Sequence, residues 1–134
     1  MRARDVYRPV VATCAPGDRL TDVAKTMVTT DSGFVAILDE GRLDGVITER
    51  DLVRALAREP DPGAATAADH ATRGLVTAAP DDDLSAVARR MVDADVRHLP
   101  VVDEHGELLG VVSMRDVFAV ETLLSTQPEP SATA

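Results

Sequence analysis

Two stretches of the chain each hold a short apolar run that begins with glycine, then a hydroxyl side chain and, three residues later, a carboxylate. The first copy places Thr48 before Asp51, and the second places Ser113 before Asp116. A helix that begins at such a hydroxyl exposes backbone N–H groups and the positive end of its dipole, which favour a phosphate. A carboxylate one turn further on can accept hydrogen bonds from both hydroxyls of a ribose. The same side chains can equally serve only to cap their own helices, and both interpretations stay open.

The two copies of this motif lie at matching places in a longer internal repeat. Residues 15–24 align with residues 79–88, and the alignment continues through the motif, with more identities than chance would give. Gly45 and Gly110 open the motif late in an expected strand, where the missing side chain lets another backbone or a ligand approach closely. The repeat therefore predicts two copies of one structural unit.

Each copy predicts a strand, a helix, two strands joined by a turn, and a second helix. Apolar residues recur at helical spacing in residues 20–28 and 84–92, and Asp18 and Asp82 in front of them are candidate N-caps. The second helices begin at Glu49 and Met114, with Leu52, Val53, Leu56, Val117, Val120 and Leu124 facing inward. Short helices are expected at Arg4–Tyr7 and Thr66–Thr72. The strands are expected at Val10–Thr13, Phe34–Leu38, Leu43–Ile47, Leu75–Thr77, His98–Val102 and Leu108–Val112.

This order of elements predicts a mixed α/β fold of two βαββα units, divided as residues 1–65 and 66–124. One unit of about 60 residues is marginal by itself, so the two are expected to share buried sheet faces. Residues 125–134 hold few apolar side chains and are expected to be a disordered tail.

Composition excludes several classes of function. The net charge is −9 and aromatic residues make up 2% of the chain, which disfavours nucleic acid and anionic membranes as partners. Cys14 is the single cysteine, and His70, His98 and His105 are scattered, so no metal cluster is expected. No apolar run approaches a membrane span, which favours a cytoplasmic protein. No nucleophile lies beside a base, so an enzyme is not expected.

The motif Gly-apolar-apolar-(Thr/Ser)-x-x-Asp, found twice in a duplicated unit and preceded in the second copy by Val96–Asp103, resembles the CBS domain family. The resemblance implies a pseudo-twofold pair with two clefts between the copies, which bind adenine nucleotides or adenosyl compounds. It also implies a homodimer, with apolar faces of the second helices as candidate contacts, that regulates a separate protein target. In this family Asp51 and Asp116 would hold ribose, and Thr48 and Ser113 would hold phosphate.

The resemblance assigns residues of each copy to its own site. The first site comprises Thr13, Cys14, Phe34, Ala36, Thr48, Arg50 and Asp51, and the second comprises Thr77, Ala78, His98, Pro100, Val101, Ser113, Arg115 and Asp116. The second is the favoured pocket, because Arg97, His98 and Arg115 could meet phosphates, whereas Ala36 stands where the family commonly has proline. The expected regulatory ligand is AMP, ADP, ATP or S-adenosylmethionine, with no required cofactor. The alternative is an interaction protein whose ligand sites are vacant.

Overall fold

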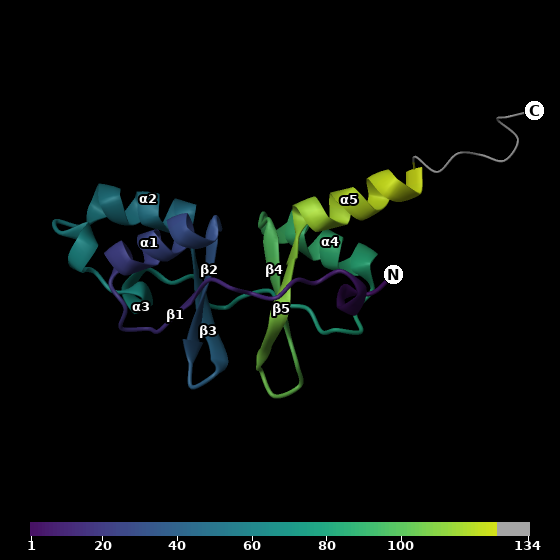
Figure 1. Ribbon diagram of the computed structural model, residues 1–134, viewed down its shortest axis with the longest axis horizontal. Coiled ribbons are helices and arrows are strands. Elements are labelled where there is room, and N and C mark those ends of the chain that lie inside the picture. The colour runs from purple at the N-terminus through teal and green to yellow at the C-terminus, as the bar shows by residue number, and fades with distance from the viewer. Residues whose placement is uncertain (126–134) are drawn as a thin grey trace, which may run out of the picture.

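The computed structural model describes residues 1–125 of the 134-residue chain as two similar halves that stand side by side (Figure 1). Each half directs a β-hairpin toward the other half and keeps its helices on the outer side. In chain order the elements are η1 (Ala3–Asp5), β1 (Thr13–Cys14), α1 (Leu20–Thr30), β2 (Phe34–Asp39), β3 (Arg42–Thr48), α2 (Glu49–Arg58), η2 (Pro62–Ala64), α3 (Ala67–His70), α4 (Leu84–Ala94), β4 (His98–Val102), β5 (Leu108–Ser113) and α5 (Met114–Ser125). The predicted mixed α/β fold is therefore confirmed.

The two hairpins form separate small sheets. Strands β2 and β3 pair antiparallel, and β1 adds to β2 in parallel. Strands β4 and β5 pair antiparallel in the second half, where the predicted strand Leu75–Thr77 is replaced by one parallel bridge between Ala78 and Val101. The predicted first strand at Val10–Thr13 is likewise shorter and later, as β1. These two connections run beside the hairpins with little regular pairing.

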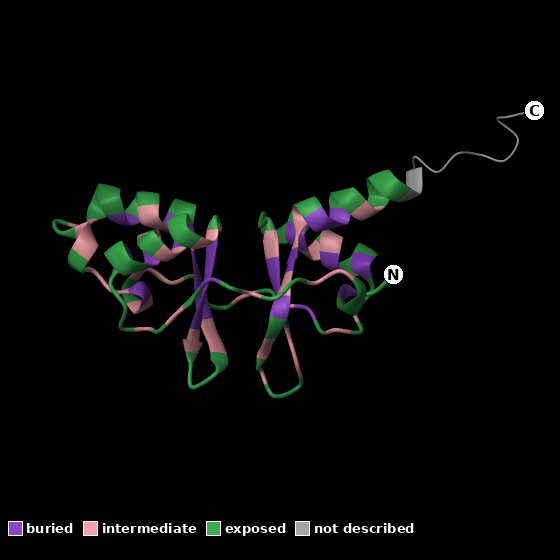
Figure 2. Ribbon diagram, in the orientation of Figure 1, coloured by how far each residue is buried: buried purple, intermediate pink, exposed green. Residues whose placement is uncertain are grey.

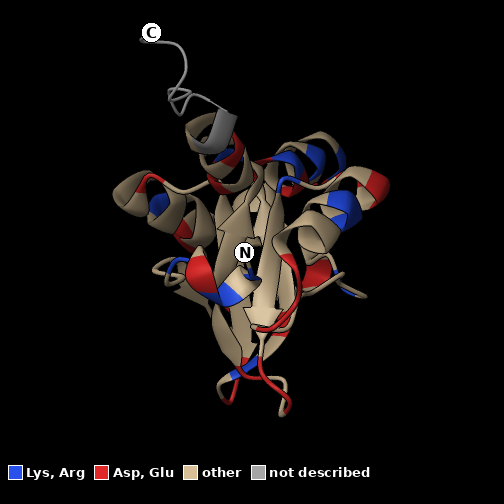
Figure 3. Cartoon of the chain, turned by 90° about the vertical axis from the view of Figure 1, so that its right-hand side faces the viewer, with Lys and Arg blue, Asp and Glu red and all other residues tan. Residues whose placement is uncertain are grey.

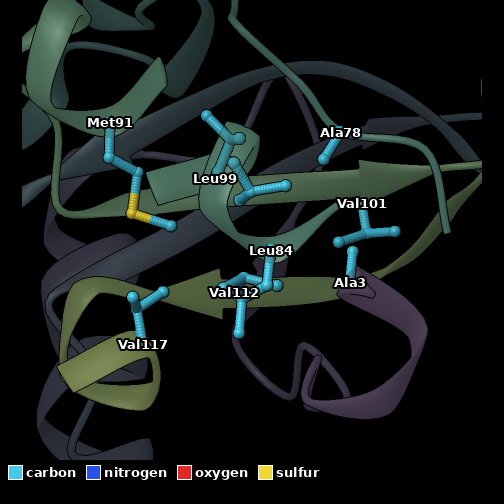
Figure 4. Close-up of a cluster of buried hydrophobic side chains, with 9 residues drawn as sticks. Ala3, Ala78, Leu84, Met91, Leu99, Val101, Val112 and Val117 are labelled. Carbon is cyan, nitrogen blue, oxygen red and sulfur yellow. The ribbon is translucent and has the colours of Figure 1, made fainter. Parts of the chain in front are cut away.

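The N-terminal segment of the chain packs on the second half rather than on its own half. The Ala3 N–H donates to the Asp82 carbonyl at 2.9 Å, and Arg8 and Val111 exchange two backbone hydrogen bonds at 2.9 and 3.0 Å. Ala3 is fully buried among side chains of the second half, beside Val101 in the close-up (Figure 4). The first residues of the first copy thus complete the core of the second.

The segment between the copies makes the reciprocal crossing. The Ala67 N–H at the start of α3 donates to the Asp18 carbonyl at 2.7 Å, and Thr72 and Val46 exchange backbone hydrogen bonds at 2.9 and 3.1 Å. Ala67 is buried in the core of the first half. Each half therefore contains a segment from the other copy, an exchange that a division of the sequence at residue 65 does not reveal.

Buried side chains form a core in each half and a third cluster between the halves. Figure 2 shows burial concentrated along the strands, with the outer helix faces exposed. The cluster between the halves is built on Phe34, Ala36 and Val46, and side chains of the second half, including Leu108 and Val111, pack against it. Fully burying one such aliphatic side chain stabilises a fold by about 1.5–3 kcal/mol, so this cluster holds the hairpins together.

The first helix of each half begins and ends in the same way. Arg19 and Asp83 are the N-cap residues of α1 and α4, so the predicted caps Asp18 and Asp82 are each one residue too early. The carboxylates of Asp18 and Asp82 instead accept hydrogen bonds from the N–H groups of Ala15 and Ala79, which close the turns before the helices. Both helices end at an aspartate in the left-handed conformation, a common helix stop.

Helix faces are buried less widely than the apolar pattern predicted. In α2 the side chains of Val53 and Leu56 are exposed, and the small Ala55 faces the core instead. Val28 of α1 and Val92 of α4 are also exposed. Figure 3 shows that the charged residues are scattered along the helices, loops and hairpin turns, while most of the strand ribbon holds none. The predicted tail begins inside α5, which ends at Ser125, and the rest of that tail lies outside the described residues.

Candidate functional site

Thr48 and Asp51 form a reciprocal cap at the start of α2. The Asp51 carboxylate accepts hydrogen bonds from the Thr48 N–H at 2.9 Å and from the Thr48 hydroxyl at 3.1 Å. The Asp51 N–H donates in return to the Thr48 hydroxyl oxygen at 3.4 Å. Asp51 is 6% exposed, so this carboxylate is fixed in one orientation by its own helix.

Ser113 and Asp116 repeat this arrangement at the start of α5. The Ser113 N–H donates to the Asp116 carboxylate at 3.2 Å, and the Asp116 N–H donates to the Ser113 hydroxyl oxygen at 3.0 Å. Asp116 is 8% exposed. The capping interpretation is thus confirmed in both copies, while a role of these four side chains toward a ligand stays a prediction.

The two buried carboxylates differ in the partner that the exchanged segments bring to them. The Thr72 hydroxyl lies 3.3 Å from both carboxylate oxygens of Asp51. The Arg8 guanidinium Nε lies 2.9 Å from Oδ1 of Asp116. Asp51 also has the Arg54 guanidinium at 3.8 Å, on the exposed side of α2. The exchanged segment therefore brings a neutral hydroxyl to Asp51 and a cation to Asp116, while Arg54 of its own helix stands farther from Asp51.

Gly45 and Gly110 explain how these segments come so close to the motif. A methyl group added at Gly110 would lie 2.6 Å from the Arg8 carbonyl oxygen and would overlap the Tyr7 ring. A methyl group added at Gly45 would lie 3.0 Å from the Thr72 carbonyl oxygen. The predicted close approach at both glycines is confirmed, and the approaching group is the backbone of the exchanged segment.

A cavity of about 760 Å³ opens at Asp51, between the two halves. Its volume lies in the range of about 300–1,000 Å³ that is typical of small-molecule sites. Both copies line it, because the start of α2 faces the connection before β4 and the start of β4 itself. Of the residues predicted from the sequence, it is lined by Phe34, Thr48, Arg50, Asp51, His98 and Pro100.

This lining corrects the grouping expected from the sequence. His98 and Pro100 were expected to share a site with Asp116 of their own copy, but they line the cavity of Asp51 in the other copy. The reason is the geometry of the hairpins, which places the start of β4 opposite the start of α2 across the interface. Asp116, which the sequence favoured, does not line this cavity.

The other predicted residues lie elsewhere. Thr77 lines a separate cavity of about 240 Å³. Ala36, Ala78 and Val101 are buried in the hydrophobic clusters, Thr13 and Arg115 are exposed, and Cys14 is half-buried. Ser113 is half-buried at the cap of α5. The structure therefore brings together fewer than half of the predicted residues in the cavity at Asp51.

Several lining residues were not predicted, among them Arg54, Thr72, Gly74, Leu75 and Val76. Arg54 lies one helical turn after Asp51, and that spacing alone could have indicated it. Thr72 aligns with Arg8 in the repeat, but only the exchange of segments places it at the Asp51 carboxylate. The sequence pattern carries no signal for that long-range placement.

The charges of the cavity lining balance although the chain is acidic. Arg50, Arg54 and Arg97 stand against Glu49, Asp51 and Asp95 in the lining, while the whole chain has a net charge of −9. The site therefore repels an anionic ligand less than the average surface of this protein does. Arg97, which the sequence associated with a phosphate, is among the lining cations.

The His98 ring stacks on the Phe34 ring at the interface of the halves. The ring centroids lie 5.3 Å apart with an angle of 29° between the planes. Burial lowers the pKa of His98, and Arg97 lowers it further, although the Asp116 carboxylate acts in the opposite direction. Phe34, which the sequence offered as a surface for a base, is itself buried at 4% exposure. Both rings line the cavity, and the lowered pKa favours the uncharged form of the His98 imidazole there.

Other chemistries have less support among residues 1–125. Within this described part of the chain, no three His, Cys, Asp or Glu side chains gather in a metal-binding arrangement. Burial raises the pKa of the Cys14 thiol to about 11, with a smaller contribution from the Asp18 carboxylate, which is opposite to the activation of a nucleophile. No helix of the described chain combines the length and apolar character that crossing a membrane requires.

Comparison with solved structures identifies the architecture. The CBS domain pair of protein MJ0100, in complex with 5′-methylthioadenosine and S-adenosyl-L-methionine, has a TM-score of 0.83 and 26% identity, covering 92% of this chain and 98% of that one. The CBS domain protein PAE2072 from Pyrobaculum aerophilum, complexed with AMP, has a TM-score of 0.82 and 26% identity, covering 95% and 100%.

Comparison of sequences gives the same result. Protein MK0525 of Methanopyrus kandleri is 34% identical over 122 residues, which are 90% of this chain and 62% of that protein. The chain spans 62%, 43% and 23% of the lengths of three curated relatives that it matches. The family model of the CBS domain matches the sequence at residues 3–58 and again at residues 67–121. The chain therefore belongs to the CBS domain family, whose motif it carries as a tandem pair.

Proposed function

We propose that this CBS pair is a regulatory module that binds an adenine nucleotide or an adenosyl compound in the cavity at Asp51. The observation that carries the proposal is the position of the buried Asp51 carboxylate and the start of α2 on a cavity of about 760 Å³, with arginines from both halves in its wall. This choice of the Asp51 site differs from the sequence-based prediction, which favoured the Asp116 site. The ligand classes are AMP, ADP, ATP and S-adenosylmethionine, and no cofactor is required.

The lining offers a group for each part of such a ligand. The Asp51 carboxylate can accept hydrogen bonds from ribose hydroxyls if the Thr72 hydroxyl yields its place. Thr48 and the start of α2, with Arg50, Arg54 and Arg97 nearby, suit a phosphate or a carboxylate. The apolar side chains among the lining residues, such as Val46, Leu75 and Val76, suit the flat faces of a base. The ligands named for MJ0100 and PAE2072 belong to the same chemical class.

The proposed output is a change in a separate protein partner. A ligand changes the balance of two conformations only if it binds them with different affinities, and a cavity between two halves can do so by altering how they pack. We further propose a cytoplasmic homodimer that joins through α2 and α5, where Val53, Leu56 and Phe118 are exposed. Catalysis, nucleic-acid binding and membrane binding form no part of this proposal.

The test is thermal unfolding of the chain with and without AMP, ADP, ATP and S-adenosylmethionine, in the wild type, Asp51→Asn and Asp116→Asn. A ligand at about 100 times its Kd adds about 2.7 kcal/mol to stability, or about 5–10 °C in Tm for a chain of this size. We expect one ligand to raise the wild-type Tm and to lose that effect in Asp51→Asn. Loss in Asp116→Asn alone would move the site to the second copy, contrary to the proposal.

A second function is an interaction protein with vacant ligand sites. The observation that favours it is that both buried carboxylates already have hydrogen-bond partners within the chain, Thr72 at Asp51 and Arg8 at Asp116. Absence of a Tm shift with all four ligands, in a protein that still unfolds cooperatively, would favour this alternative. The exposed apolar side chains of α2 and α5 would then be the surface to examine.

A further inference from the structure

The two motif carboxylates are related by the repeat, but the side chain that the exchanged segment brings to each carboxylate differs in charge. Arg8 and Thr72 hold equivalent places, because each pairs its backbone with the strand that leads into the motif of the other half, at Val111 and Val46. The side chain at this place points to the buried aspartate in both halves. In one half it is a hydroxyl and in the other a guanidinium.

This difference decides how readily a ribose could replace the side chain from the exchanged segment. At Asp51 a ribose hydroxyl would replace a neutral hydroxyl that lies 3.3 Å from both oxygens, so like replaces like. At Asp116 it would replace a guanidinium Nε at 2.9 Å, a charge-assisted hydrogen bond to a carboxylate that is 8% exposed. Charge-assisted bonds are about twice as strong as neutral ones. Although the Arg8 side chain is 73% exposed, its displacement would leave the buried Asp116 charge without its cation.

A second difference between the halves acts in the same direction. Two residues after Thr72, Gly74 lines the cavity, and a methyl group added there would meet nothing within 4 Å. Two residues after Arg8, the equivalent place holds Val10, which packs against the cluster of Phe34, Ala36 and Val46. Open space in one half thus corresponds to a packed side chain in the other.

We propose that Arg8 acts as an internal occupant of the ribose position at Asp116, so that each chain binds one adenosyl ligand, at Asp51, and not two. The identity of the ligand class rests on the function proposed above. The closing of Asp116 by Arg8 rests only on the contacts described here. In this arrangement the N-terminal segment sets the number of sites, with Arg8 at the carboxylate and Val10 in the place that Gly74 leaves open in the other half.

The experiment is equilibrium dialysis with saturating labelled AMP, and separately with labelled S-adenosylmethionine, to count ligands per chain. Arg8→Thr copies the residue of the open half, and Thr72→Arg copies the residue of the closed half. Arg4→Thr is the matched control, because Arg4 lies on the same segment and pairs with the exposed Asp81. We expect one ligand in the wild type and the control, two in Arg8→Thr and none in Thr72→Arg.

The other outcomes are equally decisive. Two ligands in the wild type, or one ligand in the wild type, in Arg8→Thr and in Arg8→Thr with Val10→Gly, would overturn the proposal. Weaker binding in Arg8→Thr than in the wild type would also overturn it, since Arg8 would then be holding the ligand. If the wild type binds neither probe, the proposed function fails, and a gain of one ligand in Arg8→Thr would still support closure by Arg8. No gain would refute it. If Arg8→Thr does not unfold cooperatively, the ligand count is repeated with Arg8→Gln.

Discussion

Replacing Gly110 by alanine should expel the N-terminal segment from the second half. The added methyl group would lie 2.6 Å from the Arg8 carbonyl oxygen, and it would overlap the Tyr7 ring. A backbone carbonyl cannot rotate away as the end of a long side chain can. The segment must therefore shift as a whole, and its two backbone hydrogen bonds with Val111 must lengthen or break.

The cost can be bounded from the contacts at risk. Overpacking a well-filled site costs about 1–3 kcal/mol. Loss of the Arg8 contact would add about 0.2–1 kcal/mol, because the Arg8 side chain is 73% exposed and water screens its ion pair. We expect Gly110→Ala to lower the free energy of unfolding by about 1–4 kcal/mol. Gly45→Ala, where the nearest backbone oxygen is at 3.0 Å, should cost about 1 kcal/mol.

Urea unfolding followed by circular dichroism measures both values, with Gly17→Ala as the control because a methyl group there would meet nothing within 4 Å. Limited trypsin digestion adds an independent readout, since a displaced segment exposes the bonds after Arg2 and Arg4, whereas Pro9 keeps the bond after Arg8 resistant. We expect faster cleavage after Arg2 and Arg4 in Gly110→Ala only. Equal costs at Gly110 and Gly45, with unchanged cleavage, would show that the exchanged segment does not pack as described.

Three further predictions concern single side chains. Burial lowers the pKa of His98 below its ordinary 6.5, so the unfolded chain gains a proton that the folded chain resists, and stability should fall as the pH drops below about 6.5. Unfolding free energies measured between about pH 8 and pH 5 should fall less steeply in His98→Gln, and identical slopes would refute this. Cys14, with a pKa of about 11 against 9.0 for a free thiol, should react with iodoacetamide roughly 100-fold more slowly in the folded chain than in urea, whereas equal rates would contradict its burial. Light scattering should find a dimer that Phe118→Glu converts to a monomer, and a monomeric wild type would exclude the proposed joining through α5.

Local patterns predicted the hairpins and the caps of the second helices well, but placed the caps of the first helices one residue too early. The strand His98–Val102 was predicted with the bounds that the structure has. Strands β2 and β5 differ from their predicted bounds by one residue at one end, and β3 differs by one residue at each end. Short apolar runs between turn residues determine such strands by themselves. The hydroxyl and carboxylate of each motif are three residues apart, so their reciprocal bonds were also readable from spacing.

The cavity could not be predicted in the same way, because its walls come from distant parts of the chain. Thr72 reaches Asp51, and Arg8 reaches Asp116, only through the exchange of segments between the halves. The pairing of α2 with β4 depends on how the two hairpins pack, which no local period encodes. The prediction for the inward face of α2 was correct for Leu52, which packs against the core, but wrong for Val53 and Leu56. Close packing on the sheet places the small Ala55 inward instead.

The distinction between local and distant contributions also explains why two copies of one unit can have unequal sites. The cap and its aspartate are needed for the helix to begin, so a working copy of the unit keeps them whether or not a ligand binds. Residues 8, 10, 72 and 74 belong to the exchanged segments and are not needed for the cap. They can differ between the halves while both caps stay the same, and they do, as Arg8 and Val10 against Thr72 and Gly74. We therefore expect any difference between the two proposed sites to come from the exchanged segments, because the motif supplies the same buried carboxylate in both halves.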